Sequence, residues 1–219
     1  MRRFTQSIII GLVQINQPLN MGRFYFPYST GLLEAYVRQY THDINRYLFL
    51  PPLFKKIPLK KALQELFYAD IVGFSTYTWN IQFSLALAQG LKKQNPHVLI
   101  IFGGPHVPDQ AESFLQQHPF IDICCHGEGE KVFFDLLEGY PAKDWQAIPA
   151  ISYMDAKHQF QNHPKAKRLE DINEIPSPYL TNVFQPLIKM NPFQSWSVLW
   201  ETNRGCPFSC TFCDWGSAV

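Results

Sequence analysis

Short apolar runs rich in β-branched residues alternate with segments of helical periodicity through residues 7–139. This alternation is typical of β–α units that build a parallel sheet. The apolar runs predict five strands, at Ser7–Ile15, Ile44–Leu50, Ile71–Ser75, Val98–Phe102 and Ile121–Cys125. We therefore expect an α/β fold with a five-stranded parallel sheet.

Two apolar stripes with helical spacing lie between these runs. The first consists of Leu59, Ala62, Leu63, Leu66 and Phe67, at positions i, i+3, i+4, i+7 and i+8. The second consists of Val132, Phe133, Leu136 and Leu137, with Gly139 as the expected C-cap. We expect both stripes to face the core.

Right-handed crossovers would bring the carboxyl ends of all five strands to one edge of the sheet, which is where open α/β sheets bind ligands. Ser75–Asn80, Gly103–His106 and His126–Glu130 follow three of the strands. Hydroxyl groups there can cap a helix or bind a ligand, and glycines let the backbone approach a flat or phosphate-bearing molecule. Tight turns also require Gly, Ser and Thr, but three such loops on one edge favour a binding site.

The chain has no G-x-G-x-x-G after its first strand and no G-x-x-x-x-G-K-[ST], which argues against dinucleotide and nucleoside triphosphate sites. A flavodoxin-like strand order remains possible, and periodicity leaves open whether the crevice holds a flavin, a corrin or nothing.

Composition narrows the functional classes further. The 219 residues are 46% hydrophobic and 17% charged, with a formal net charge of +1. This balance gives no general attraction to nucleic acid or to an anionic membrane. The run Ile8–Val13 is interrupted by Gly11 and lacks a signal-peptide cleavage site, and no run approaches the roughly 18 apolar residues of a membrane span. We expect a soluble, cytoplasmic protein.

The β–α alternation stops near Pro141, and a proline-rich stretch around Ile175–Pro178 follows. Ser195–Trp200 then predicts one more strand. We expect three parts: a sheet domain at 1–140, a connector at 141–194, and the beginning of another domain at 195–219.

Cys206, Cys210 and Cys213 have the spacing C-x3-C-x2-C. Three thiols on one loop can hold a [4Fe–4S] cluster and leave one iron open to another ligand. A structural zinc site usually needs four protein ligands, and unliganded core cysteines are a further alternative. Cys124 and Cys125 are adjacent on a strand, so their side chains point to opposite faces, and we interpret them as buried core thiols.

The cysteine spacing, with the aromatic Phe212 just before the third cysteine, resembles that of the radical S-adenosylmethionine (SAM) enzymes. The resemblance implies that Cys206, Cys210 and Cys213 each ligate one iron of a [4Fe–4S] cluster. The fourth iron would bind S-adenosyl-L-methionine, which is cleaved to a deoxyadenosyl radical. It also implies an electron donor such as a flavodoxin or ferredoxin, and an unidentified small-molecule or peptide substrate.

The sheet domain is similar to the cobalamin-binding domain of the B12-dependent branch of that family, through Asp70–Ser75, Gly103–His106 and Gly127–Glu130. By this resemblance, cobalamin would lie over the strand edge. Its expected neighbours are Ser75, Thr76, Thr78, Gly103, Gly104, Gly127 and Glu128. The cobalt-ligating motif D-x-H-x-x-G is absent, so we expect neither the cofactor's own base nor a histidine on the lower face of cobalt. We interpret His106 and His126 as loop hydrogen-bonding residues.

A radical SAM barrel typically takes about 250 residues, whereas six residues follow Cys213. We therefore expect an N-terminal portion without catalytic activity of its own, with the SAM and substrate contacts beyond Val219 and an exposed, oxygen-labile, poorly ordered cluster loop. The resemblance implies radical methyl transfer to an unactivated carbon or phosphorus centre, with cyclisation or rearrangement as other outcomes. The alternative is a non-catalytic cobalamin-binding module with a vestigial cysteine loop.

Overall fold

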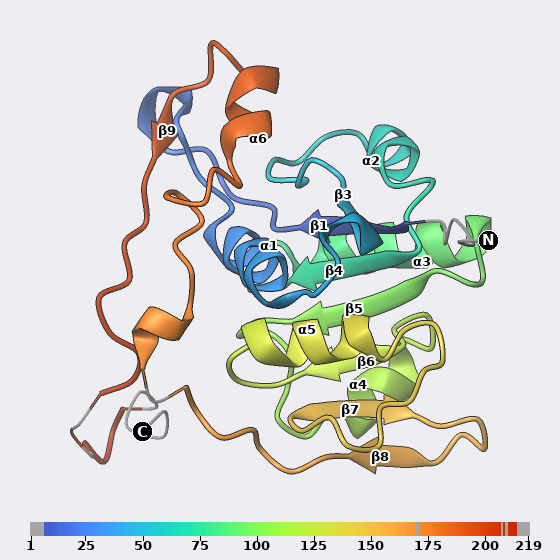
Figure 1. The fold of residues 1–219 in the computed structure, drawn as a ribbon. Coiled ribbons are helices and arrows are strands. Elements are labelled where there is room, and N and C mark those ends of the chain that lie inside the picture. The colour runs from blue at the N-terminus through green and yellow to red at the C-terminus, as the bar shows by residue number, and fades with distance from the viewer. Residues whose placement is uncertain (1–6, 170, 207, 209, 214–219) are drawn as a thin grey trace.

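The computed structural model describes residues 7–169, 171–206, 208 and 210–213. A central sheet carries helices on both faces (Figure 1). Its parallel part contains β1 (Ile8–Val13), β3 (Tyr47–Phe49), β4 (Ile71–Ser75), β5 (Leu99–Gly103) and β6 (Ile123–Cys125). These strands lie in the order β3-β1-β4-β5-β6, which confirms the α/β class and is the flavodoxin-like order.

The sheet has seven strands rather than the predicted five. β7 (Ile151–Met154) and β8 (Phe160–Asn162) form a hairpin that pairs antiparallel with β6. The sequence did not reveal this hairpin because its turn has no glycine: His158 takes a φ of +58°, and the Asp155 carboxylate accepts hydrogen bonds from two backbone N–H groups. The hairpin lies inside the stretch interpreted as a connector, and the domain boundary at residue 140 stays a prediction.

Two layers of helices cover the sheet (Figure 1). α1 (Tyr28–Tyr40) and α5 (Glu130–Glu138) pack on one face. The other face is covered by α2 (Leu59–Glu65), α3 (Ile81–Gln94) and α4 (Glu112–Gln117). Each face has its own apolar cluster, and the strands are buried between them.

Only one of the two predicted apolar stripes is fully buried. All four apolar residues of the α5 stripe are buried, and Gly139 is the C-cap of that helix, as predicted. In the other stripe Ala62 and Leu66 are buried, but Leu59 is exposed and Phe67 is 50% exposed. α2 ends at Glu65, so Phe67 lies beyond the C-cap and no longer follows the helical face.

Cys124 and Cys125 are buried on opposite faces of the sheet, as predicted. Burial raises the pKa of the Cys125 thiol to about 12, and it raises the pKa of Cys124 as well. Both side chains are therefore neutral thiols in the core at physiological pH.

A second, smaller sheet joins distant parts of the chain. β2 (Phe24–Tyr25) pairs in parallel with β9 (Trp196–Ser197), next to α6 (Gln185–Met190) (Figure 1). Trp196 stacks on Phe26, with 4.6 Å between ring centroids. The predicted strand Ser195–Trp200 is shorter than expected, because β2 offers two residues for pairing and Trp200 is 87% exposed.

Three short 3-10 helices complete the described structure: η1 (Asn20–Gly22), η2 (Ile44–Arg46) and η3 (Ile172–Glu174). η2 replaces the first half of the predicted strand Ile44–Leu50, because the Asp43 carboxylate caps it by accepting from the Asn45 N–H. Across the described residues, no helix combines the length and apolar character needed to cross a bilayer.

Candidate functional site

The loops after β4 and β5 are tied together at the carboxyl edge of the sheet. Both the backbone N–H and the hydroxyl of Thr76 donate to the Gly103 carbonyl, at 2.7 and 2.8 Å. The His106 N–H in turn donates to the Thr76 carbonyl at 3.2 Å. Thr76 is fully buried and its hydroxyl is already engaged, so this residue supports the loops rather than offering a free donor.

Two glycines on neighbouring loops of this edge have left-handed backbone conformations. Gly104 has a φ of +97°, and an added Cβ would lie 2.7 Å from the Thr76 carbonyl oxygen. Gly127 has a φ of +69°, with no atom within 4 Å of an added Cβ. Both residues are exposed, so a flat ligand can approach their backbone closely.

These two glycines predict different costs on substitution. Gly127→Ala should lose about 1–2 kcal/mol of unfolding free energy, from backbone strain alone. Gly104→Ala should lose a further ~1–3 kcal/mol, because its methyl group would collide with the Thr76 backbone. Urea unfolding of both variants checks the difference, and equal losses would contradict the close packing of these two loops.

The remaining predicted neighbours on these loops differ in how accessible they are. Ser75 is buried at the end of β4, Gly103 is half-buried at the end of β5, and Thr78 is exposed. Ser75, Gly103 and Gly104 therefore line the seam between the two strand ends, and Thr78 lies further out on its loop.

Asn80 is a buried residue that the sequence interpretation did not select. Its amide donates to the carbonyls of Ile15 and Ser75, at 3.2 and 3.0 Å, and its Oδ1 accepts from the Tyr77 N–H at 2.8 Å. Trp79 also donates to the Ile15 carbonyl, and its ring stacks on Tyr77. Asn80 thus fixes the loop at the boundary between β1 and β4, where the strand order reverses and ligands bind in such sheets.

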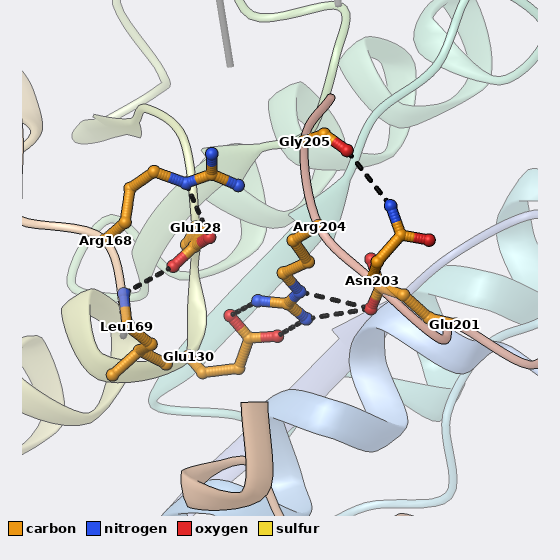
Figure 2. A network of polar contacts seen from close by, with 8 residues as sticks. All are labelled: Glu128, Glu130, Arg168, Leu169, Glu201, Asn203, Arg204 and Gly205. Carbon is orange, nitrogen blue, oxygen red and sulfur yellow. Dashed lines mark hydrogen bonds and ion pairs between the residues drawn. The ribbon is translucent and has the colours of Figure 1, made fainter. Parts of the chain in front are cut away.

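The glutamates of the third loop face later parts of the chain (Figure 2). Glu128 accepts from Arg168 Nε at 3.3 Å and from the Leu169 N–H at 3.1 Å. Glu130 accepts two hydrogen bonds from the guanidinium of Arg204, at 2.6 and 3.0 Å. Glu128, predicted as a cobalamin neighbour, therefore holds residues 168–169 against the loop.

Histidine geometry at this edge agrees with a hydrogen-bonding role for His126. Its Nε2 lies 2.7 Å from the Ser152 hydroxyl, and its backbone N–H donates to the Ala150 carbonyl. Burial lowers the pKa of His126, with the charge of Asp109 opposing this shift, so the imidazole is neutral near pH 7. His106, on the loop after β5, is half-buried.

The three late cysteines lie on one loop. Cys206 is half-buried, Cys210 and Cys213 are exposed, and the Cys213 N–H donates to the Cys210 carbonyl at 3.1 Å. Thiols on a single turn of chain suit an iron–sulfur cluster as a donor set, because the exposed side chains can reorient around it. Within the described ranges no three Cys, His, Asp or Glu side chains are grouped as a metal site. The aromatic Phe212 is exposed, and Pro207 and Ser209 lie outside the described residues.

The sequence of this chain is similar to those of known proteins over most of its length. Residues 29–137 match the family described as the B12 binding domain. Over 201 residues the chain is 38% identical to the cobalamin-dependent radical SAM methyltransferase TokK of Streptomyces tokunonensis. The chain carries the B12-binding domain of cobalamin-dependent radical SAM methyltransferases. The TokK match covers 89% of this chain and 29% of the relative.

A second curated relative and a solved structure are also similar to this chain. The 2-(S-pantetheinyl)-carbapenam-3-carboxylate methyltransferase of Streptantibioticus cattleyicolor is 36% identical, over 89% of this chain and 29% of its own length. The structure of the cobalamin-dependent SAM radical enzyme OxsB with aqua-cobalamin and SAM bound superposes with a TM-score of 0.74 at 22% identity. That superposition covers 95% of this chain and 28% of OxsB, and it shows that the fold is shared.

Proposed function

We propose that this chain binds cobalamin across the carboxyl edge of its sheet, as part of a radical SAM methyltransferase. The observation that carries the proposal is the pair of exposed, left-handed glycines, Gly104 and Gly127, on adjacent loops within the B12-binding match. Both glycines are exposed, and the space beside Gly127 is open to a large planar ligand at the carboxyl edge of the sheet, where open α/β sheets bind ligands. The chain spans 29% of the length of TokK, so the activity of a whole protein is part of the proposal.

Different residues of the edge take different roles in holding cobalamin. Thr78, Gly103, Gly104 and Gly127 would lie against it, whereas Ser75, Thr76 and Glu128 would fix the loops that carry them. His126 is engaged with Ser152, and no histidine follows the motif D-x-H-x-x-G. We therefore propose that cobalt has no histidine ligand from this chain. Bound cobalamin would supply the methyl group.

The cysteine loop would hold a [4Fe–4S] cluster through Cys206, Cys210 and Cys213. Each side chain must lose its thiol proton to ligate iron. Three protein ligands leave one iron for S-adenosyl-L-methionine, which supplies a deoxyadenosyl radical when the cluster is reduced. An electron donor such as a flavodoxin or ferredoxin, and the reducing cytoplasm, fit these requirements.

We propose that the reaction transfers a methyl group to an unactivated carbon or phosphorus centre of a small molecule or peptide. Two relatives above 35% identity are named methyltransferases, which supports it. Cyclisation is the second candidate, because the anaerobic magnesium-protoporphyrin IX monomethyl ester cyclase of Rubrivivax gelatinosus is 28% identical over 148 residues. In a third possibility the chain stores or senses cobalamin and its cysteine loop binds no cluster.

Anaerobic titration with hydroxocobalamin tests the corrin site. The wild-type chain should change the corrin absorption spectrum with a stoichiometry of one. Gly127→Asn should weaken binding at least tenfold, because asparagine tolerates a positive φ and its side chain would fill the space left for the corrin.

Gly22→Asn is the matched control, because Gly22 also has a φ of +69° and no atom within 4 Å of an added Cβ, but it lies in η1 rather than on the strand edge. Gly22→Asn should bind like the wild type. An unchanged corrin spectrum with the wild-type chain would remove the cobalamin assignment, and equal affinities of the two variants would move the site away from Gly127.

A further inference from the structure

An ion pair between distant parts of the chain connects the two candidate cofactor sites. Glu130 is the first residue of α5 and follows the loop that contains Gly127. Arg204 lies two residues before Cys206, the first of the three late cysteines. We propose that the Glu130–Arg204 pair is a positioning device, which fixes the cysteine loop beside the corrin-facing loop. This inference rests on the proposed function.

The pair has the geometry of a specific anchor. Arg204 donates through both terminal nitrogens to the two carboxylate oxygens of Glu130, at 3.0 and 2.6 Å (Figure 2). The Glu130 side chain is 5% exposed and that of Arg204 is 16% exposed. Two parallel hydrogen bonds fix the orientation of a guanidinium as well as its distance, and burial limits screening by salt.

Neighbouring groups support both partners. Glu201 accepts from Nε and Nη2 of Arg204, at 3.2 and 3.1 Å, so the guanidinium is held between two carboxylates (Figure 2). Glu130 lies at the amino end of α5, where the helix dipole favours a negative charge. Tyr28, at the start of α1, lies near the same network: burial and then the charge of Glu201 raise the pKa of its hydroxyl.

Upstream of Arg204 the chain is held more loosely. After β9, the segment runs along the carboxyl side of the main sheet (Figure 1). Tyr179 fixes Leu199, donating to its carbonyl at 2.8 Å and accepting from its N–H at 3.2 Å. Between these anchors Trp200 is 87% exposed, and Thr202 and Asn203 are exposed as well.

Chain length shows how much the pair restricts the thiols. Cys206 lies two positions after Arg204, so an intact pair keeps this cysteine within about 7 Å of the Arg204 backbone. Without the pair, Leu199 becomes the preceding anchor in the described chain, seven residues away, and the reach grows to about 25 Å. A cluster on such a tether would not keep a fixed place beside the corrin loop.

Hydrogen–deuterium exchange of the 219-residue chain tests the anchor without any cofactor. Glu130→Gln removes one charge and keeps the size of the side chain, whereas Arg204→Gln removes the guanidinium and its charge and shortens the side chain. We expect amide exchange of residues 201–206 to rise at least tenfold in both variants, while the amides of α5 keep their wild-type exchange. Lys131→Gln is the control, because it breaks the exposed Lys131–Asp135 pair on the same helix and should change neither region.

A magnetic measurement then tests the positioning role. In the reconstituted, reduced chain loaded with cob(II)alamin, the wild type should show spin–spin coupling between cluster and cobalt. Arg204→Gln should lose this coupling and keep cobalamin affinity within about twofold of the wild-type value, because Arg204 lies outside the proposed corrin contacts.

The outcomes separate this inference from the proposed function. A wild-type chain that binds neither cobalamin nor a cluster would refute the proposed function, whatever the exchange data show. Unchanged exchange of residues 201–206 in both glutamine variants would overturn the anchor. An increase in amide exchange that is equally large in α5 would assign the pair to helix stability and would overturn the positioning role. Spin–spin coupling that is retained in Arg204→Gln would overturn it as well.

Discussion

Cys210→Ala should abolish assembly of the iron–sulfur cluster. Two remaining thiolates from Cys206 and Cys213 would leave two irons without protein ligands, and such a cluster would not survive in water. Anaerobic reconstitution with iron and sulfide, followed by iron analysis and electron paramagnetic resonance of the reduced sample, measures the loss. We expect close to four irons per wild-type chain and a background level in the variant, following the ligand count of a [4Fe–4S] site.

Cys125→Ala is the control for this experiment. Cys125 is buried in the sheet, and its pKa of about 12 keeps it a protonated thiol that does not ligate iron. This variant should take up as much iron as the wild type. Full iron incorporation by Cys210→Ala would contradict the three-thiolate site and would leave the cobalamin assignment in place.

Phe102→Ala should produce the largest loss of stability of the variants considered. Phe102 is fully buried near the carboxyl end of β5, with its ring centroid 4.7 Å from that of Phe74 and 6.4 Å from that of Phe114. Truncating such a side chain removes buried apolar surface and leaves a cavity, at a cost of about 3–5 kcal/mol. Urea unfolding monitored by circular dichroism measures the change.

Phe67→Ala provides the comparison, because the same substitution is made at a residue that is 50% exposed. It should lose less than about 1 kcal/mol, in keeping with partly exposed sites. Equal losses at both positions would mean that Phe67 belongs to the core, as its sequence spacing suggested, and that the observed end of α2 is wrong.

The hydrophobic pattern was sufficient to predict that the sheet contains five parallel strands. Buried strands such as β4 and β5 are continuous apolar runs, because helices cover both of their faces. The β7–β8 hairpin escaped prediction because a histidine, rather than a glycine, takes the left-handed position in its turn. The first half of the predicted strand Ile44–Leu50 is a 3-10 helix because an aspartate cap decided the local conformation.

The loops of the candidate site could be predicted from the sequence, but the ion pairs that hold these loops could not. Strand ends and glycines could be read from local sequence, and the structure brings the loops that carry them to one edge of the sheet. The Glu130–Arg204 pair joins residues 74 positions apart, and the Glu128–Arg168 pair spans 40. Local patterns hold no information about such distant partners, so neither ion pair could be predicted from the sequence.

The outermost strands of the main sheet are β3 and β8, and each has three residues. A short edge strand offers few unpaired backbone N–H and C=O groups to another polypeptide. Because β7 of the antiparallel hairpin pairs with β6, the buried apolar strand β6 is not an edge strand. This arrangement protects the protein against edge-to-edge aggregation, so deleting residues 151–162 would be expected to promote self-association through β6.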